Sequence, residues 1–322
     1  MTLNAPARTF TDKPATREAT PLLVGLFGPS GGGKTYSALR LATGIQKVVG
    51  GDIFGIDSES RRMLHYADKF NFRHVQFDAP FGSLDYLAAA EHCVKQGAKV
   101  LIIDSASHEH EGPGGVLEQH AEETKRLAKA WNCSEDKAQI AAWASPKQAR
   151  RRMINTLLQI NANFVFCFRA REKIKIITGK PPLELGFMPI CGEEFFFEMT
   201  LSTLLLPGDK GVPRWGSDFV GERTMMKLPG QFEAMFGKPK QLDEETGQQL
   251  AEWSAGVPVI DISALVKRYH DATDAPALAM VETLRQEAWP RLNATQKRSL
   301  KSASDEASKR LSPPKSGPEV FG

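Results

Sequence analysis

The sequence predicts an α/β fold: a doubly wound, mostly parallel sheet with a small helical region at its C-terminal end. Two observations carry this prediction. Short apolar runs of strand length alternate with stretches of helical periodicity, which is the pattern of strands joined by crossover helices in a parallel sheet. The runs are apolar at almost every position, as in strands buried on both faces. After about Asp243 the pattern changes to short amphipathic helices.

The predicted elements follow one another from Pro21. Apolar strands are expected at 22–27, 52–57, 98–104 and 163–168, with a weaker strand at 72–78. Helices are expected at 35–49 and 83–97, and a long helical stretch at 116–160 is expected to break near 132–134 and at Pro146. Residues 193–207 are expected to form a further strand, and 207–218 a hairpin or loop rich in turn formers.

Composition divides the chain into four regions. We expect a disordered leader at 1–20, the sheet domain at 21–240, a helical region at 241–311 and a disordered Pro/Gly/Ser-rich tail at 312–322. The leader lacks the apolar segment of a secretory signal, and no apolar run reaches the roughly 18 residues of a membrane span. The four cysteines form no CxxC pair, which favours free thiols in a reducing cytosol. The net charge of +3 neither requires nor excludes nucleic acid.

A glycine-rich segment between the first strand and the first helix carries the strongest functional signal. "GPSGGGKT" (28–35) matches G-x-x-x-x-G-K-[ST], the P-loop that binds nucleotide phosphates through backbone N–H groups. Lys34 is predicted to neutralise the β- and γ-phosphates of ATP, and Thr35 to ligate Mg²⁺. The predicted nucleotide contacts are Gly28, Pro29, Ser30, Gly31, Gly32, Gly33, Lys34, Thr35 and Tyr36.

Two other strands end in acidic residues. "KVLIIDS" (99–105) supplies Asp104, which is predicted to hold Mg²⁺ through its water shell, although a strand-end Asp can also cap the next turn. "GIDSESRR" (55–62) supplies Glu59, which is predicted to orient the water that attacks the γ-phosphate. Asp57 is the alternative bearer of that role. A second interpretation is that Ser58 or Ser60 caps a helix with Glu59 in its first turn.

These motifs, in the order "GPSGGGKT", "IDSE" (56–59) and "LIIDS" (101–105), resemble those of the RecA-like ATPases over roughly 21–206. "DSASHEHEGPGGVLEQH" (104–120) resembles a segment of phage and prophage nucleotide-binding proteins known as AAA-family or minimal RecA-like ATPases. The resemblance implies Mg²⁺-dependent ATP hydrolysis with Glu59 as the water-activating carboxylate. It also implies a role in phage-type DNA recombination, annealing or replication, as a ring or filament in the cytoplasm of a bacterial host. Glu109 competes with Glu59 for the catalytic role.

The chain departs from the RecA-like pattern after the strand at 163–168. Arg169 and Arg171 stand where RecA-like proteins place a polar sensor, often Gln. They are predicted to contact the γ-phosphate in the same subunit or in a neighbour's site, the alternative being a solvated strand end. The basic runs 146–153 and 169–180 suit contact with a nucleic-acid backbone, but they lack aromatic residues for stacking single-stranded bases, and the alternative is a solvated face. Single-stranded DNA or a DNA-bound protein is the expected partner. Two rival functions remain: a nucleotide-switched assembly or loading factor, and a small-molecule kinase.

Overall fold

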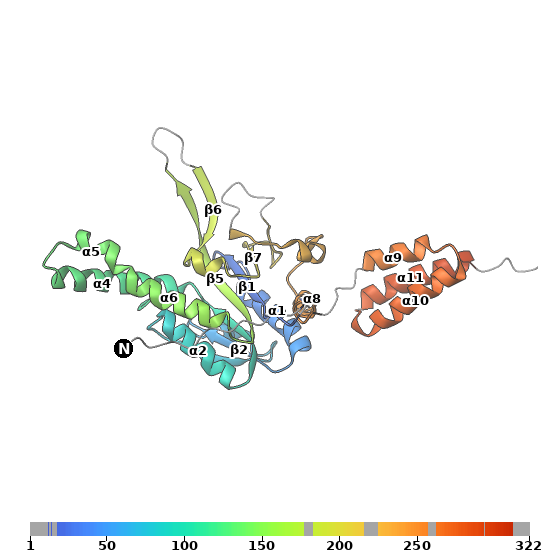
Figure 1. Ribbon diagram of the computed structural model, residues 1–322, viewed down its shortest axis with the longest axis horizontal. Helices are drawn as coiled ribbons and strands as arrows, with labels where there is room; N and C mark the ends of the chain where they lie inside the picture. The colour runs from blue at the N-terminus through green and yellow to red at the C-terminus, as the bar shows by residue number, and fades with distance from the viewer. Residues whose placement is uncertain are drawn as a thin grey trace, which may run out of the picture. The chain divides into compact units, whose positions relative to one another are not determined.

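The computed structural model describes residues 12, 14, 18–176, 183–215, 225–256, 262–292 and 294–311 (Figure 1). The chain divides into two compact units, Met1–Val257 and Pro258–Gly322, which we call the first unit and the C-terminal unit. The predicted tail at 312–322 lies outside the described residues, as does most of the predicted leader at 1–20.

The first unit is built on a mostly parallel sheet, which confirms the predicted α/β class. Its strands run in the order β3-β2-β4-β5-β1-β7, and every neighbouring pair along this path is parallel. The bounds are β1 (Leu23–Gly28), β2 (Asp52–Asp57), β3 (Arg73–Gln76), β4 (Ala98–Asp104), β5 (Asn163–Lys175) and β7 (Leu201–Leu204). Strand β5 therefore lies between β1, which leads into the glycine loop, and β4, which ends in Asp104.

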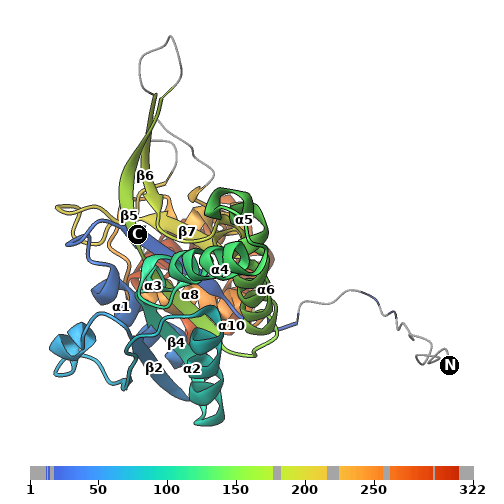
Figure 2. The same cartoon turned by 90° about the vertical axis from the view of Figure 1, so that its left-hand side faces the viewer.

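Strand β5 is longer than expected because its second half leaves the parallel sheet. Residues Ala170–Lys175 pair antiparallel with β6 (Leu183–Pro189). The two strands extend beyond the rest of the sheet, as both views show (Figures 1 and 2). The first half of β5 pairs with β1 and β4, so one continuous strand runs from the centre of the sheet into the β5–β6 hairpin.

Helices cover both faces of the sheet, as the continuous apolar strands require. On β5, Phe164, Phe166 and Phe168 join one buried cluster, whereas Val165 and Cys167 join the other. The first cluster includes α2 (Ser83–Lys95) and α6 (Ala144–Leu157). The second includes α1 (Lys34–Val49) and α8 (Glu244–Ser254). The alternation of side chains along each strand thus fixes a two-faced core.

The long helical stretch divides into α4 (Val116–Ala130), α5 (Glu135–Ala142) and α6, with shorter helices α3 (His108–Glu111) and η1 (Arg62–Tyr66) before it. The break expected near 132–134 is confirmed. The break expected at Pro146 falls instead at Trp143, and Pro146 lies in the first turn of α6, where its missing N–H costs no helical hydrogen bond.

The strand predicted over 193–207 is partly wrong. Its beginning is the helix α7 (Glu193–Phe196), and only Leu201–Leu204 forms a strand. A helical turn allows the adjacent residues Phe195 and Phe196 both to be buried, with Phe195 against Phe166 and Phe196 against Phe27. In a strand, consecutive side chains point to opposite faces.

The C-terminal unit has a core of its own. It consists of α9 (Ile262–Asp271), α10 (Ala275–Ala288), η5 (Trp289–Arg291) and α11 (Ala294–Leu311). Its buried side chains are Leu265, Tyr269, Val281, Ala288, Leu292, Leu300, Ala303 and Ala307. The division after Val257 falls later in the chain than the expected boundary at 240/241, because α8, preceded by η4 (Gly230–Phe236), packs on α1.

Among the described residues, no helix combines the length and apolarity needed to cross a membrane.

Candidate functional site

A pocket of about 600 Å³ lies at the carboxyl ends of β1, β2 and β4, beside the middle of β5. Ligand sites of doubly wound sheets lie at this edge. The predicted residues that line it are Pro29, Ser30, Gly31, Gly33, Lys34, Thr35, Glu59, Asp104 and Arg169. Residues that the sequence did not single out for it also contribute: Arg62, Tyr66, Glu111, Ala170 and Ile190. Gly28, Gly32, Tyr36 and Arg171 are not part of this lining.

The glycine loop needs its glycines for two physical reasons. A Cβ on Gly28 or Gly32 would lie 2.0 or 2.3 Å from the carbonyl oxygen of Leu205, which is far inside contact distance. Gly31 and Gly33 have φ values of +81° and +83°, in the left-handed region that favours glycine. The loop is therefore shaped by backbone packing against the segment after β7.

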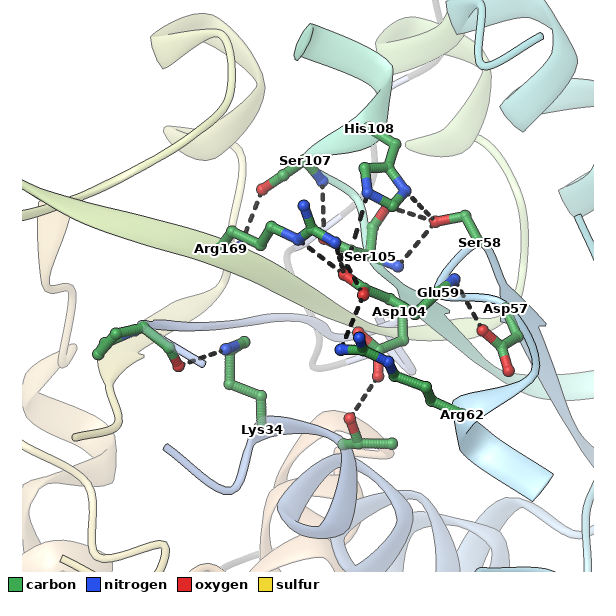
Figure 3. Close-up of polar contacts among 12 residues, drawn as sticks. Lys34, Asp57, Ser58, Glu59, Arg62, Asp104, Ser105, Ser107, His108 and Arg169 are labelled. Atoms are coloured by element: carbon green, nitrogen blue, oxygen red, sulfur yellow. Dashed lines mark hydrogen bonds and ion pairs between the residues drawn. The ribbon is translucent and has the colours of Figure 1, made fainter. Parts of the chain in front are cut away.

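Lys34 is the first residue of α1 and projects into the loop. Its Nζ donates hydrogen bonds to the carbonyl oxygens of Gly28 and Pro29, both at 2.8 Å. Figure 3 draws one of these two bonds. Burial lowers the pKa of Lys34 below its usual value, although the nearby carboxylates of Asp104 and Glu59 oppose this shift. An anion entering the loop would offer this ammonium group a stronger acceptor than the two carbonyl oxygens.

Thr35 and Asp104 bring two oxygen ligands together across the pocket floor. Thr35 Oγ1 donates to Asp104 Oδ2 at 2.5 Å. Asp104 is buried, and burial raises its pKa to about 6 despite the bond from Thr35. Hard oxygen donors of this kind suit Mg²⁺, which typically takes one or two protein ligands and keeps several waters. No group of three or more His, Cys, Asp or Glu side chains that could hold a metal is found among the described residues.

Glu59 reaches the pocket just beyond β2 and meets Arg169 from β5. Arg169 Nε donates to Glu59 Oε1 and Nη2 to Oε2, both at 2.8 Å, so the pair is bidentate (Figure 3). Arg62 Nη1 lies 3.4 Å from Glu59 Oε2. Burial raises the pKa of Glu59, but the hydrogen bonds and charge of Arg169, with His108 and Arg62, outweigh it and hold the pKa below the usual value.

Asp57 stabilises the turn after β2 by accepting backbone hydrogen bonds. Its Oδ1 accepts the backbone N–H of Glu59 at 2.8 Å, and its Oδ2 accepts that of Met63 at 3.0 Å and lies 3.1 Å from His74 Nε2. Asp57 is buried and does not line the pocket. The tight turn after β2 is therefore capped by Asp57 and not by the serines considered from the sequence.

The hydroxyl of Ser58 connects the turn after β2 to the chain beyond β4. Ser58 Oγ accepts the N–H of Ser105 at 2.9 Å, donates to the carbonyl oxygen of the same residue, and lies 2.8 Å from His108 Nδ1. The Asp104–Ser105 peptide bond is cis. His108 Nε2 lies 4.0 Å from Glu59 Oε1, and burial, with the charge of Arg169, lowers the pKa of this histidine.

Glu109 faces away from the pocket into a buried ion pair. Its Oε1 accepts from Arg150 Nε at 3.0 Å and from Ser83 Oγ at 2.5 Å, and its Oε2 accepts from Arg150 Nη2 at 2.9 Å. Of the three carboxylates considered for water activation, Asp57, Glu59 and Glu109, Glu59 is the one that lines the pocket. The ion pair also gives Arg150, a member of the basic run 146–153, a structural role in the core, whereas Arg151 and Arg152 are exposed.

Arg171 lies two residues beyond Arg169, on the same side of β5. Its Nη2 donates to Glu111 Oε2 at 2.8 Å, and its side chain is largely exposed. Glu111 lines the pocket although Arg171 does not. Arg169 therefore lines the pocket, whereas Arg171 contacts Glu111, a residue that lines it.

Tyr66 is a pocket residue that the sequence pattern did not indicate. It ends η1, and Tyr36 packs against it with ring centroids 5.7 Å apart. Tyr36 also contacts Phe70 at 5.4 Å. Tyr36, predicted as a nucleotide contact, therefore packs against a pocket residue without lining the pocket itself. No motif marks Tyr66, since its position depends on how the chain folds after the turn at 58–63.

Comparisons with known proteins do not assign the chain to a family. No protein-family model matches it, and no curated protein matches it. Function is therefore inferred from the geometry of the pocket and the chemistry of its side chains.

Proposed function

We propose that the first unit binds Mg·ATP in this pocket and hydrolyses it to ADP and phosphate. The observation that supports the proposal most strongly is the convergence of three groups on one pocket: the glycine loop with Lys34, the Thr35–Asp104 oxygen pair, and Glu59. The pocket volume of about 600 Å³ lies within the range of ordinary small-molecule sites.

Binding is assigned to the loop and the start of α1. Backbone N–H groups there can donate to phosphate oxygens, and the helix dipole favours the negative charge. Lys34 would exchange the carbonyl oxygens of Gly28 and Pro29 for phosphate oxygens. The ring of Tyr66, backed by Tyr36, offers an aromatic surface on which a nucleobase can stack.

Hydrolysis is assigned to Glu59. A carboxylate at the pocket wall can accept the proton of a water as it attacks the γ-phosphate. Mg²⁺, held by Thr35 and Asp104, would neutralise charge on the phosphates when bound. Arg169, whose guanidinium also lines the pocket, can stabilise charge on the transferring group from within the same chain. Product release would return Lys34 and Arg169 to their partners in the empty pocket.

The pathway proposed for this ATPase is that of a RecA-like protein acting on DNA, in a ring or filament. The exposed cations Arg151 and Arg152 on α6, with Arg171 and Lys173 on the hairpin, support contact with a nucleic-acid backbone. The expected result is an ATPase rate that rises when single-stranded DNA is added and whose stimulation falls as salt increases. A rate indifferent to DNA would favour the loading-factor function.

Two variants test the core of the proposal by separating binding from turnover. Lys34→Ala removes the phosphate-binding cation and should weaken Mg·ATP binding by roughly 10- to 100-fold, the value of a charged hydrogen bond. Glu59→Gln should bind Mg·ATP at least as tightly as the wild type and lose turnover by on the order of 10²–10⁴-fold, because shape remains while the base is lost. Isothermal titration and phosphate release measure the two effects. Lys125→Ala, an exposed lysine on α4, is the matched control. Wild-type binding by Lys34→Ala would refute the assignment.

A further inference from the structure

The Arg169–Glu59 ion pair joins the proposed general base to a cation that the proposed substrate would attract. We propose that this ion pair breaks when a γ-phosphate enters the pocket, so that the site distinguishes nucleoside triphosphate from diphosphate and activates its own base only for the triphosphate. This inference rests on the proposed function and adds a specificity-determining role for the pair.

In the structure as it stands, the pairing with Arg169 makes Glu59 a poor base. Both carboxylate oxygens accept hydrogen bonds from Arg169 at 2.8 Å, and the side chain of Glu59 is only 11% exposed. A water would have to displace a charged, bidentate donor to bind there. The ion pair also holds the pKa of Glu59 low, which makes it a weaker proton acceptor.

Hydrogen bonds fix the backbone of Arg169, whereas its partly exposed side chain has room to change rotamer. Its N–H donates to Ser107 Oγ at 2.9 Å, and its carbonyl accepts from Ile190 N–H at 2.8 Å. The residue pairs in register with Gly28, the first residue of the glycine loop. Its side chain is 43% exposed and lines the pocket. A change of rotamer alone can therefore carry the guanidinium from Glu59 towards an anion in the loop.

Phosphate is the chemical group most able to compete for Arg169. It offers a bidentate acceptor with more negative charge than one carboxylate. The terminal phosphate of a triphosphate brings that charge closest to the wall opposite the loop, whereas a diphosphate ends one group earlier. We therefore expect ADP to leave the ion pair intact and ATP to break it.

Glu59 would keep its place after Arg169 leaves. Asp57 holds its backbone N–H at 2.8 Å, and Arg62 and His108 lie 3.4 and 4.0 Å from its oxygens. With the strongest cation gone, its pKa rises and it becomes a better base. Substrate binding and base activation are then the same event, and an empty or ADP-bound site stays inactive.

The test measures binding of Mg·AMP-PNP, a non-hydrolysable triphosphate, and of Mg·ADP to the full chain. Glu59→Gln removes the charge that competes for Arg169. It should tighten AMP-PNP binding by roughly 5- to 150-fold, the usual size of coupling between two sites, and leave ADP affinity within about twofold. Arg169→Ala should lose the preference for AMP-PNP over ADP but keep wild-type ADP affinity, which also shows that it is folded. Lys125→Ala, an exposed cation on α4 that does not line the pocket, is the control for charge.

The double variant tests whether the gain in AMP-PNP affinity requires Arg169 or only the loss of a negative charge at position 59. In the Arg169→Ala background, Glu59→Gln should give no further gain for AMP-PNP, because the gain requires the arginine. An equal gain there would mean that removing any negative charge suffices, and would overturn the proposal. So would equal tightening of ADP and AMP-PNP in Glu59→Gln. If the wild-type protein binds neither nucleotide while Lys34→Ala behaves identically, the proposed function itself fails.

Discussion

Gly32 shows how one absent side chain shapes the candidate site. A Cβ at this position would lie 2.3 Å from the carbonyl oxygen of Leu205, which is backbone and cannot rotate away. We expect Gly32→Ala to displace the loop, to lower the stability by about 1–3 kcal/mol as overpacking does, and to weaken nucleotide binding. Thermal melts and titration measure both effects. Gly230→Ala, where no atom lies within 4 Å of the new Cβ, should change neither; equal behaviour of the two variants would contradict this account.

His110 makes stability depend on pH. Arg150 Nη2, always a donor, lies 2.9 Å from His110 Nδ1, which must therefore be an unprotonated acceptor. Burial, with the charge of Arg150, lowers the pKa of His110, against the carboxylates of Glu109, Glu111 and Glu194. Below about pH 6.5 the unfolded chain binds a proton that the folded chain excludes, so the free energy of unfolding should fall as pH falls.

The variant His110→Asn isolates this contribution, because the Asn oxygen can still accept from Arg150 but does not titrate. Urea unfolding at pH 7.5, 6.5 and 5.5 should show a smaller loss of stability in the variant than in the wild type. Some loss should remain, since the pKa of His108 is lowered in the same way. An unchanged loss would assign the pH dependence to other groups.

At the scale of single residues, the sequence predicts the position of a functional side chain where a short contiguous motif contains it. The loop 28–35 is such a motif, and most of it lines the pocket as expected. Which of Asp57, Glu59 and Glu109 lines the pocket could not be predicted in this way. It depends on Arg169, which is 110 residues from Glu59, and on Arg150, which is 41 residues from Glu109. The spacing of residues along the chain does not indicate partners that lie so far apart in the sequence.

At the scale of elements, α1 and α8 approach so closely that glycines are needed between them. A Cβ on Gly44 would lie 2.0 Å from the carbonyl oxygen of Glu244, and one on Gly247 would lie 2.2 Å from that of Leu41. Arg40 adds a bidentate ion pair to Glu244, with Nη2 and Oε2 2.7 Å apart. These contacts hold α8 in the first unit, close to the helix that follows the glycine loop.

Gly247→Ala gives a test with an unusual sign. In an exposed helix, Gly to Ala typically stabilises by about 1 kcal/mol. Here we expect a loss of about 1–3 kcal/mol, because the methyl group meets backbone atoms of α1. Denaturant unfolding measures the difference. A more stable variant would show that α8 does not pack on α1 at this distance.

Helices and strands could be predicted from the sequence where the periodicity of apolar residues determines them. They could not be predicted where tertiary contacts determine them. The continuous apolar strands at 22–27 and 98–104 match β1 and β4 closely. The segment 193–196, with two glutamates before Phe195 and Phe196, lies within the predicted strand at 193–207, yet it forms α7, because both phenylalanines pack on rings of the sheet. A short apolar run cannot by itself distinguish a strand from a buried helical turn.

At the scale of the whole molecule, the strand order creates the candidate site. Strand β5 is inserted between β1 and β4, and this places Arg169 beside the glycine loop and within reach of the turn after β2. No feature of the sequence specifies that order, since the same alternation of strands and helices is compatible with several. The position of Arg169 relative to Glu59 is accordingly a result of topology.

The same topology predicts that Arg169 acts within its own chain, even if the protein assembles into the proposed ring or filament. It contacts Glu59 of its own chain and lines its own pocket. Arg169→Ala should therefore lose turnover by roughly 10³–10⁵-fold, as for a phosphate-stabilising arginine. Mixing it with Lys34→Ala should restore no activity, because neither chain carries a complete pocket. Wild-type activity per chain should also stay constant on dilution. Recovery of activity in the mixture, or a rate per chain that rises with protein concentration, would show instead that the arginine completes the pocket of a neighbouring subunit.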